Sequence, residues 1–259
     1  MPEFCKVERD GHLLLVTLDR PDVMNALHRP ANLELEKVFD DFAADPELWV
    51  AIVTGAGEKA FSAGNDLKYL AGGNDTTVPP RGFGGLTARF DLDKPVIAAV
   101  NGLALGGGFE IALACDIIIA AENASFGLPE PRVGLAAVAG GLLRLTRQIP
   151  VKQAMEMILT GRSVTAEEGL RLGFVNEVTP RGECLARAKS LAHEILANSP
   201  LAVRAAKHIA YRGLDSADLE TLYRAQRNLP VAQVLYQSVD AREGPKAFSE
   251  RRKPVWLGR

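Results

Sequence analysis

The chain has 259 residues, of which 47% are hydrophobic and 24% are charged, and its formal net charge is −2. This length is typical of one large domain, or of one domain with an appendage, that buries a substantial core. The near-neutral charge gives no electrostatic reason to expect nucleic acid as a partner.

The first half of the chain predicts short strands that alternate with helices. The N-terminus lacks a basic start followed by an apolar stretch, so we expect no signal peptide. A strand is expected over residues 13–18, and apolar residues at helical spacing predict a helix over 31–44. A short β-branched run at 50–54 predicts the next strand.

Two apolar runs, 96–100 and 117–121, predict fully buried strands. Asn101, Glu110 and Asp116 interrupt the surrounding apolar sequence, so we expect no membrane span there. The three cysteines lack metal-ligand spacing, which favours a reducing compartment and a cytoplasmic protein. The four histidines are also scattered, and we predict no metal site.

The second half of the chain predicts helices over 183–198, 201–212, 216–226 and 231–238, separated by proline and glycine. Strands separated by helices, followed by helices alone, indicate a layered α/β core with a helical tail. The glycine- and proline-rich segment 72–85 is expected to be an irregular loop. The sequence leaves open whether this loop is a lid or pocket wall, or plain disorder.

Two turns are candidates for binding a ligand through backbone amides. The three glycines at 106–108 precede a helical pattern, where free N–H groups and the helix dipole favour negative charge. Their spacing fits neither a phosphate loop nor a dinucleotide fold. The turn at 60–67 follows a strand, and Asp66 within it is a candidate N-cap. Two backbone donors that converge on one oxygen form an oxyanion hole, which stabilises charge developing on a carbonyl.

Two glutamates stand where a structural carboxylate is rarely found. Glu110 follows a glycine-rich apolar run, and Glu130 ends the apolar segment 126–130. Burying a carboxylate is costly unless it has an ion-pair or hydrogen-bond partner, so an unpaired one indicates a functional role. Two carboxylates in one dry cleft are suited to acid–base chemistry on a single substrate.

With these turns and glutamates, the chain resembles the crotonase (enoyl-CoA hydratase/isomerase) superfamily. The motifs that carry the resemblance are spread over the whole chain, at residues 18–27, 60–67, 101–110, 126–130 and 243–253. Within the superfamily, residues 92–102 and 254–259 are particularly similar to carnitinyl-CoA dehydratases.

The resemblance implies a fold and a set of site residues. It implies a spiral of repeated ββα units over residues 1–198, which holds the coenzyme A and active sites, and a helical region over 199–259 that packs trimers, or hexamers of two trimers. The oxyanion hole falls on the backbone N–H groups of Asn65 and Gly107, and the paired glutamates fall on Glu110 and Glu130. The first glutamate would deprotonate the water that attacks the β-carbon, and the second would manage the proton at the α-carbon.

Coenzyme A is implied as part of a thioester substrate, without a prosthetic group. Its expected contacts in this chain are Met24, Ala26, Ala63, Gly64, Asp66, Leu67 and Arg251. Arg251 is expected in the C-terminal helix, from which it would reach a coenzyme A phosphate bound to a neighbouring subunit. The alternative for this arginine is a solvated helix end.

The implied activity is hydration of a 2-enoyl-CoA, or dehydration of a 3-hydroxyacyl-CoA. The alternatives are a carnitinyl-CoA dehydratase, an enoyl-CoA isomerase, and a non-catalytic acyl-CoA- or RNA-binding relative. Asn65 stands where simple hydratases commonly have alanine and carnitinyl-CoA relatives tend to have an aromatic residue. Val138 stands where some relatives have an acidic residue. Because a trimethylammonium group usually contacts aromatic faces or carboxylates, both departures weaken the expectation of carnitinyl-CoA as substrate.

Overall fold

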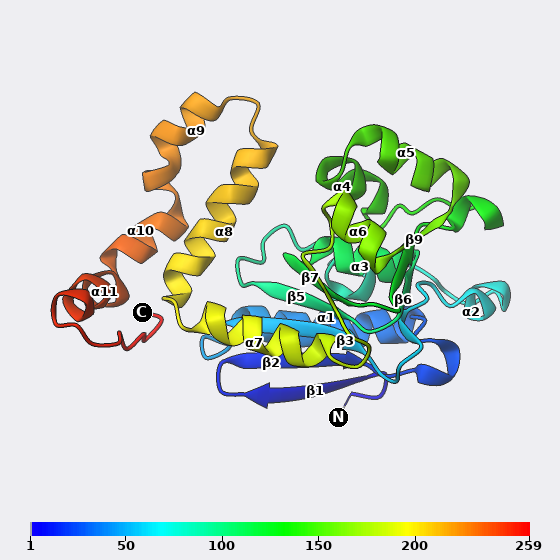
Figure 1. The fold of residues 1–259 in the computed structure, drawn as a ribbon, viewed down its shortest axis with the longest axis horizontal. Helices are drawn as coiled ribbons and strands as arrows, with labels where there is room; N and C mark the ends of the chain where they lie inside the picture. Colours follow the sequence, from blue (N-terminus) through cyan, green and yellow to red (C-terminus); the bar gives the residue numbers. More distant parts are fainter. Residues whose placement is uncertain (1) are drawn as a thin grey trace.

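Two sheets form the centre of the computed structural model, which describes residues 2–259 (Figure 1). The larger sheet has the strand order β1-β2-β3-β5-β7-β10, and the smaller has the order β4-β6-β8-β9. Strand pairs are parallel except for β1 with β2 and β8 with β9. The strands are β1 (Cys5–Asp10), β2 (Leu13–Leu18), β3 (Val50–Gly55), β4 (Ala60–Ser62), β5 (Val96–Val100), β6 (Leu103–Leu105), β7 (Ile117–Ala121), β8 (Ser125–Gly127), β9 (Ser163–Thr165) and β10 (Glu177–Thr179).

The two sheets are built together, one turn of the chain at a time. The strand pairs β3–β4, β5–β6 and β7–β8 each place the first strand in the larger sheet and the second in the smaller. Helix α2 (Leu67–Ala71) follows the first pair and α3 (Gly107–Ala114) follows the second. After the third pair come the short η3 (Glu130–Val133) and α4 (Gly141–Gln148). This repetition is the spiral of ββα units expected from the sequence.

Alternating side chains bury both faces of the larger sheet. One face packs against small residues of α7 (Cys184–Leu196), in a cluster formed by Leu13, Leu15, Val50, Ile52, Ile97, Ala99, Ile119, Ala121, Cys184, Ala188 and Ala192. The intervening strand residues face a larger core that includes Phe39 and Phe42 of α1 (Arg29–Ala44). Burial on both faces explains why the central strands are continuous apolar runs in the sequence.

The remaining helices lie around and beyond this core. They are α5 (Val151–Thr160), α6 (Ala166–Leu172), α8 (Pro200–Asp215), α9 (Leu219–Ala225), α10 (Pro230–Gln237) and α11 (Asp240–Ser249), with short 3-10 turns η1 (Pro21–Val23), η2 (Phe83–Gly85) and η4 (Gln226–Asn228). No helix within residues 2–259 is long and apolar enough to cross a membrane.

Helices α8 to α11 extend from the core as an arm (Figure 1). Asp116, which follows α3, fastens this arm to the core. Its carboxylate accepts hydrogen bonds from Lys207 Nζ at 2.7 Å and from the Tyr211 hydroxyl at 3.0 Å, both on α8. It also accepts the Val96 N–H at 2.8 Å. Both oxygens of the Asp116 carboxylate accept hydrogen bonds, so its role is structural.

The predicted elements agree with this fold, with three kinds of difference. The strands at 13–18, 96–100 and 117–121 are confirmed, and the strand predicted at 50–54 runs one residue further. The predicted helices all exist, with ends displaced by up to three residues. Strands β1 and β10, the strands of the smaller sheet and helices α4 to α6 were not predicted. In β1 only Cys5 is buried, so the sequence carries no apolar alternation to reveal it.

The loop predicted at 72–85 is ordered in its second part. Arg81 donates its backbone N–H to Glu36 Oε1 at 2.7 Å, and Gly84 donates its N–H to Asn32 Oδ1 at 2.7 Å, so two contacts tie the segment to α1. Residues 83–85 form η2 and are buried. This part of the loop is a fixed wall beside α3.

Candidate active site

Glycine at position 64 brings the turn at 63–66 against the start of α3. Gly64 has φ +86°, and a Cβ atom there would lie 2.5 Å from the Leu105 carbonyl oxygen and 2.8 Å from the Gly107 nitrogen. No other residue type fits such an approach without displacing backbone. The two turns predicted from the sequence are therefore in direct contact.

The amides of Asn65 and Gly107 are both available in this contact. Leu27 donates to the Gly64 carbonyl at 2.8 Å and accepts from the Asp66 N–H at 3.1 Å, and these two bonds flank Asn65. The Asn65 N–H consequently points away from Leu27. Among the hydrogen bonds of residues 2–259, neither the Asn65 nor the Gly107 N–H is a donor. Two free backbone donors at one place form a suitable oxyanion hole.

Glu110 lies three residues after Gly107 on α3, so both face the same side of the helix. Its side chain is buried, and Oε1 accepts the backbone N–H of Gly141 at 2.8 Å. Burial, aided by the nearby Glu130 charge, raises the pKa of Glu110 from 4.5 to about 7. A carboxyl with a pKa near neutrality exchanges protons readily at physiological pH.

Glu130 begins η3 and places its carboxyl group beside the start of α3. Its Oε1 lies 2.7 Å from the position that a Cβ atom on Gly106 would occupy. Gly106 has φ +52°, so both its backbone and the carboxyl group require glycine there. Burial raises the pKa of Glu130, and its Oε2 is a buried oxygen without a hydrogen-bond partner among the described residues. Such an unpaired oxygen is typical of a functional group rather than a structural one.

The structure thus brings together the four residues predicted for catalysis. Asn65, Gly107, Glu110 and Glu130 come from three separate segments of the sequence, the turn before α2, helix α3 and the start of η3, and meet around the first turn of α3. The charge of Glu130 contributes to the raised pKa of Glu110, after the larger effect of burial. The arrangement can polarise a carbonyl group and move protons on the adjacent carbon atoms.

Most of the residues predicted to contact coenzyme A lie on two adjoining segments next to this site. Met24 and Leu67 are exposed, and Ala63 donates its N–H to the Met24 carbonyl at 2.9 Å. Ala26 and Gly64 are buried in the same two segments. A cavity of about 240 Å³ adjoins Met24 and is separate from the two glutamates.

Asp66 has a structural role in joining these two segments. Its carboxylate accepts the Tyr69 N–H at 3.1 Å, which caps α2 as predicted, and forms an ion pair with Arg20 at 3.0 Å. Because both oxygens are engaged, the carboxylate holds the wall of the site in place.

The prediction that Arg251 lies in the C-terminal helix was wrong. Helix α11 ends at Ser249, and Arg251 has φ +53°, a left-handed conformation that ends the helix. Its side chain is exposed, and it follows α11, which lies at the end of the arm far from α2 (Figure 1). The structure of one chain therefore does not bring Arg251 together with the other predicted contacts.

Two parts of the site were not predicted from the sequence. The Gly141 N–H orients Glu110, and the Phe83 ring packs on Gly107. The glycine pair at residues 140–141, where α4 begins, was the sequence signal available for the contact with Glu110. No sequence signal identified the contact of Phe83 with Gly107, because the ring reaches Gly107 through a tertiary contact of the irregular loop.

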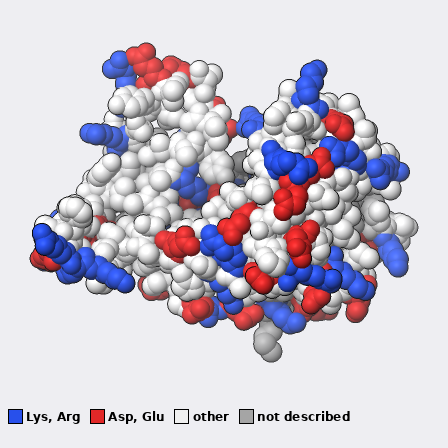
Figure 2. Space-filling model, viewed as in Figure 1, with Lys and Arg blue, Asp and Glu red and all other residues white. Residues whose placement is uncertain are grey.

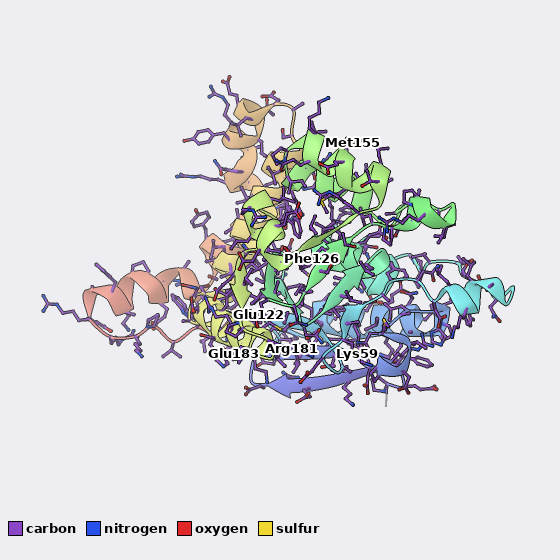
Figure 3. All side chains as sticks on the ribbon, turned by 45° about the vertical axis from the view of Figure 1, so that its right-hand side comes forward. Lys59, Glu122, Phe126, Met155, Arg181 and Glu183 are labelled. Atoms are coloured by element: carbon purple, nitrogen blue, oxygen red, sulfur yellow. The ribbon has the colours of Figure 1, made fainter. Side chains whose placement is uncertain are left out.

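A separate group of charged residues lies in the lower half of the molecule in Figure 3, where Lys59, Glu122, Arg181 and Glu183 belong to the connections that follow β3, β7 and β10. Arg181 forms an ion pair with Glu58 at 2.9 Å, and its N–H donates to Glu122 Oε1 at 3.3 Å. These exposed pairs are a solvated edge of the sheet and contribute little to stability.

Three comparisons relate this geometry to known proteins. The model of the family described as Enoyl-CoA hydratase/isomerase matches residues 8–259. A carnitinyl-CoA dehydratase of Salmonella typhi is 49% identical over the full length of both chains. The crystal structure of an enoyl-CoA hydratase from Mycobacterium tuberculosis H37Rv is similar with a TM-score of 0.93 and 42% identity, and covers 99% of each chain. That of a carnitinyl-CoA hydratase from Mycobacterium avium has a TM-score of 0.78 and 44% identity, and covers 100% of each.

Proposed function

Because this chain belongs to the enoyl-CoA hydratase/isomerase family, we propose that its hydro-lyase activity acts on 2-enoyl-CoA thioesters through Glu110 and Glu130. The single observation that carries the proposal is the meeting of a buried and a half-buried carboxyl group, those of Glu110 and Glu130, with two free backbone amides at the start of α3. The substrate supplies coenzyme A, and the chemistry requires no prosthetic group.

The thioester carbonyl accepts hydrogen bonds from the N–H groups of Asn65 and Gly107. These bonds draw electron density toward the oxygen, make the β-carbon electrophilic and stabilise enolate-like charge. Backbone donors serve this purpose with any side chain at position 65, so the asparagine affects the pocket rather than the hole.

Glu110 takes the role of base toward water. Its carboxylate is oriented by the Gly141 N–H, and its pKa of about 7 leaves a substantial ionised fraction at neutral pH. Glu130 delivers a proton to the α-carbon, for which its Oε2 is available because it has no hydrogen-bond partner among the described residues. Dehydration runs through the same steps in reverse. The presence of both groups favours a hydro-lyase over an isomerase, which needs one of them.

The preferred acyl group is uncharged. The segment 134–141 next to Glu110 contains no acidic residue, and Val138 within it has 84% of its surface exposed. The guanidinium of Arg144 lies close enough to Glu110 to influence its pKa. The segment 134–141 therefore offers a trimethylammonium group no carboxylate partner. Carnitinyl-CoA remains the second candidate, favoured by the 49% identity with a carnitinyl-CoA dehydratase.

We also propose that the region 199–259 packs trimers or hexamers and that Arg251 binds a coenzyme A phosphate of a neighbouring subunit. Figure 2 shows mostly uncharged surface over α8 and α10, with charges gathered toward the ends of the arm. Exposed apolar side chains on the arm include Leu214, Tyr223 and Tyr236, whose exposed fractions are 78%, 72% and 66%. An exposed apolar face of this kind is typical of a subunit interface.

Loss of the 2-enoyl thioester absorbance tests the proposal. Crotonyl-CoA, a longer 2-enoyl-CoA and crotonobetainyl-CoA are compared in parallel, with each product identified by its mass. We expect rapid addition of water to at least one of the first two substrates. Turnover of crotonobetainyl-CoA alone would establish the second candidate, and no addition of water to any of the three would refute the proposed activity.

A further inference from the structure

One aromatic ring covers the residue that carries an oxyanion donor. A Cβ atom added to Gly107 would lie 2.8 Å from both Cδ1 and Cζ of Phe83. The ring therefore occupies the space beside the Gly107 Cα where a side chain would otherwise stand. Phe83 is 5% exposed, and the mechanism proposed above assigns it no role.

The turn that delivers this ring is fixed between α1 and α3. The N–H of Gly84 donates to Asn32 Oδ1 of α1 at 2.7 Å, in a buried hydrogen bond. Gly84 and Gly85 have φ values of +62° and +66°, and a Cβ atom on either would lie 2.5 Å from Ile111 Cδ1 of α3 or from the Glu36 nitrogen of α1, respectively. Positions fixed by packing and buried hydrogen bonds hold a site to a narrow geometry.

Resting on the function proposed above, we propose that Phe83 is a specificity-determining residue that excludes branched acyl groups next to the thioester. The N–H of Gly107 faces the thioester oxygen while the ring covers the Cα of the same residue. The first carbon atoms of the acyl chain are then held beside a rigid aromatic wall. The preferred substrates are therefore 2-enoyl-CoA thioesters without a substituent at C2.

Two substrates that differ by one methyl group differ in kcat/KM by roughly 10- to 200-fold when the pocket accommodates only one of them. Under the proposal a methyl group at C2 meets this limit, because the Phe83 ring lies beside the Cα of the residue that donates to the thioester oxygen. The measured quantity is the ratio of kcat/KM for 2-methylcrotonyl-CoA to that for crotonyl-CoA, because a general loss of folded enzyme cancels from it.

Phe83→Leu removes the ring but keeps an apolar side chain, and Phe109→Leu is its matched control. Phe109 is fully buried, but its ring packs on Phe126 and Phe174, with centroid distances of 5.3 and 5.1 Å. We expect Phe83→Leu to raise the ratio about tenfold. Phe109→Leu should leave the ratio within twofold of the wild-type value despite a comparable loss of thermal stability. Provided that the wild type hydrates crotonyl-CoA, two results overturn the proposal. One is an equal change of the kcat/KM ratio in both variants, and the other is no change of this ratio in either variant.

A binding experiment separates this proposal from a failure of the hydro-lyase function. Butyryl-CoA and 2-methylbutyryl-CoA have no double bond to hydrate, and calorimetry gives the Kd of each for the wild type and both variants. When the wild type hydrates no enoyl-CoA, the ratio of these Kd values decides. If 2-methylbutyryl-CoA alone binds more tightly, and only to Phe83→Leu, the result supports the role of Phe83 without the proposed activity. An unchanged ratio of Kd values overturns the role of Phe83 as well as the proposed activity.

Discussion

Replacing Glu110 with glutamine should slow hydration strongly and stabilise the protein at alkaline pH. The carboxyl group is 3% exposed, and burial is the main cause that raises its pKa from 4.5 to about 7. A raised pKa means that the folded protein binds this proton more tightly than the unfolded chain. The associated stability is therefore fully present below pH 4.5 and is lost as the pH rises to about 7. The loss amounts to about 3 kcal/mol at 1.36 kcal/mol for each tenfold change in proton affinity.

Glutamine cannot ionise, but its oxygen can still accept the Gly141 N–H. Glu110→Gln should be more stable than the wild type by up to about 3 kcal/mol at pH 8 and by a negligible amount near pH 4.5. Urea unfolding at the two pH values measures this difference, and crotonyl-CoA hydration should fall at least ~100-fold. Glu8→Gln, on the exposed strand β1, is the control and should change neither quantity. Equal stability of Glu110→Gln and the wild type at pH 8 would refute the reasoning that this buried charge is uncompensated.

Three further changes test the site and its support. Glu130→Gln should lower hydration by roughly 10²- to 10⁴-fold, whereas calorimetry should find the Kd of butyryl-CoA within threefold of the wild-type value; near-normal turnover would exclude the two-glutamate mechanism. Gly106→Ala should reduce both stability and turnover, because its Cβ would lie 2.7 Å from Glu130 Oε1. Gly11→Ala, with φ +55° and no atom within 4 Å of its Cβ, should cost about 1 kcal/mol in urea unfolding without loss of turnover; equal turnover in the two alanine variants would contradict the clash. Lys207→Met removes a partner of the half-buried Asp116 and should lower the free energy of unfolding by about 1–3 kcal/mol; unchanged unfolding would show that this contact does not fasten the arm.

The sequence predicted the elements whose signals are local. The strands at 96–100 and 117–121 are continuous apolar runs because both faces of the larger sheet are buried, and proline or glycine marks the ends of most helices. Strand β1 was missed because its side chains are almost all exposed. The strands of the smaller sheet are three residues long, which is too short for a periodic pattern.

The candidate site was predictable only in part. Glu110 and Glu130 stood out because a carboxylate in an apolar segment has to be explained, and resemblance to a family added the amides of Asn65 and Gly107. The contact that joins the two turns depends on Gly64, whose role appears only when the chain is folded. The position of the Phe83 ring also appears only when the chain is folded, because it depends on the packing of η2 between α1 and α3, which are distant in sequence.

The most direct test of the central claim is the mass of the product formed from crotonyl-CoA in D₂O. The account predicts 3-hydroxybutyryl-CoA that has gained one molecule of water, with one carbon-bound deuterium at C2, in the wild type and with greatly reduced yield in Glu110→Gln and Glu130→Gln. Deuterium at C2 or C4 without the gain of water would indicate isomerase chemistry, and release of free coenzyme A would indicate thioester hydrolysis. Either result would contradict the assignment of this site as a hydro-lyase.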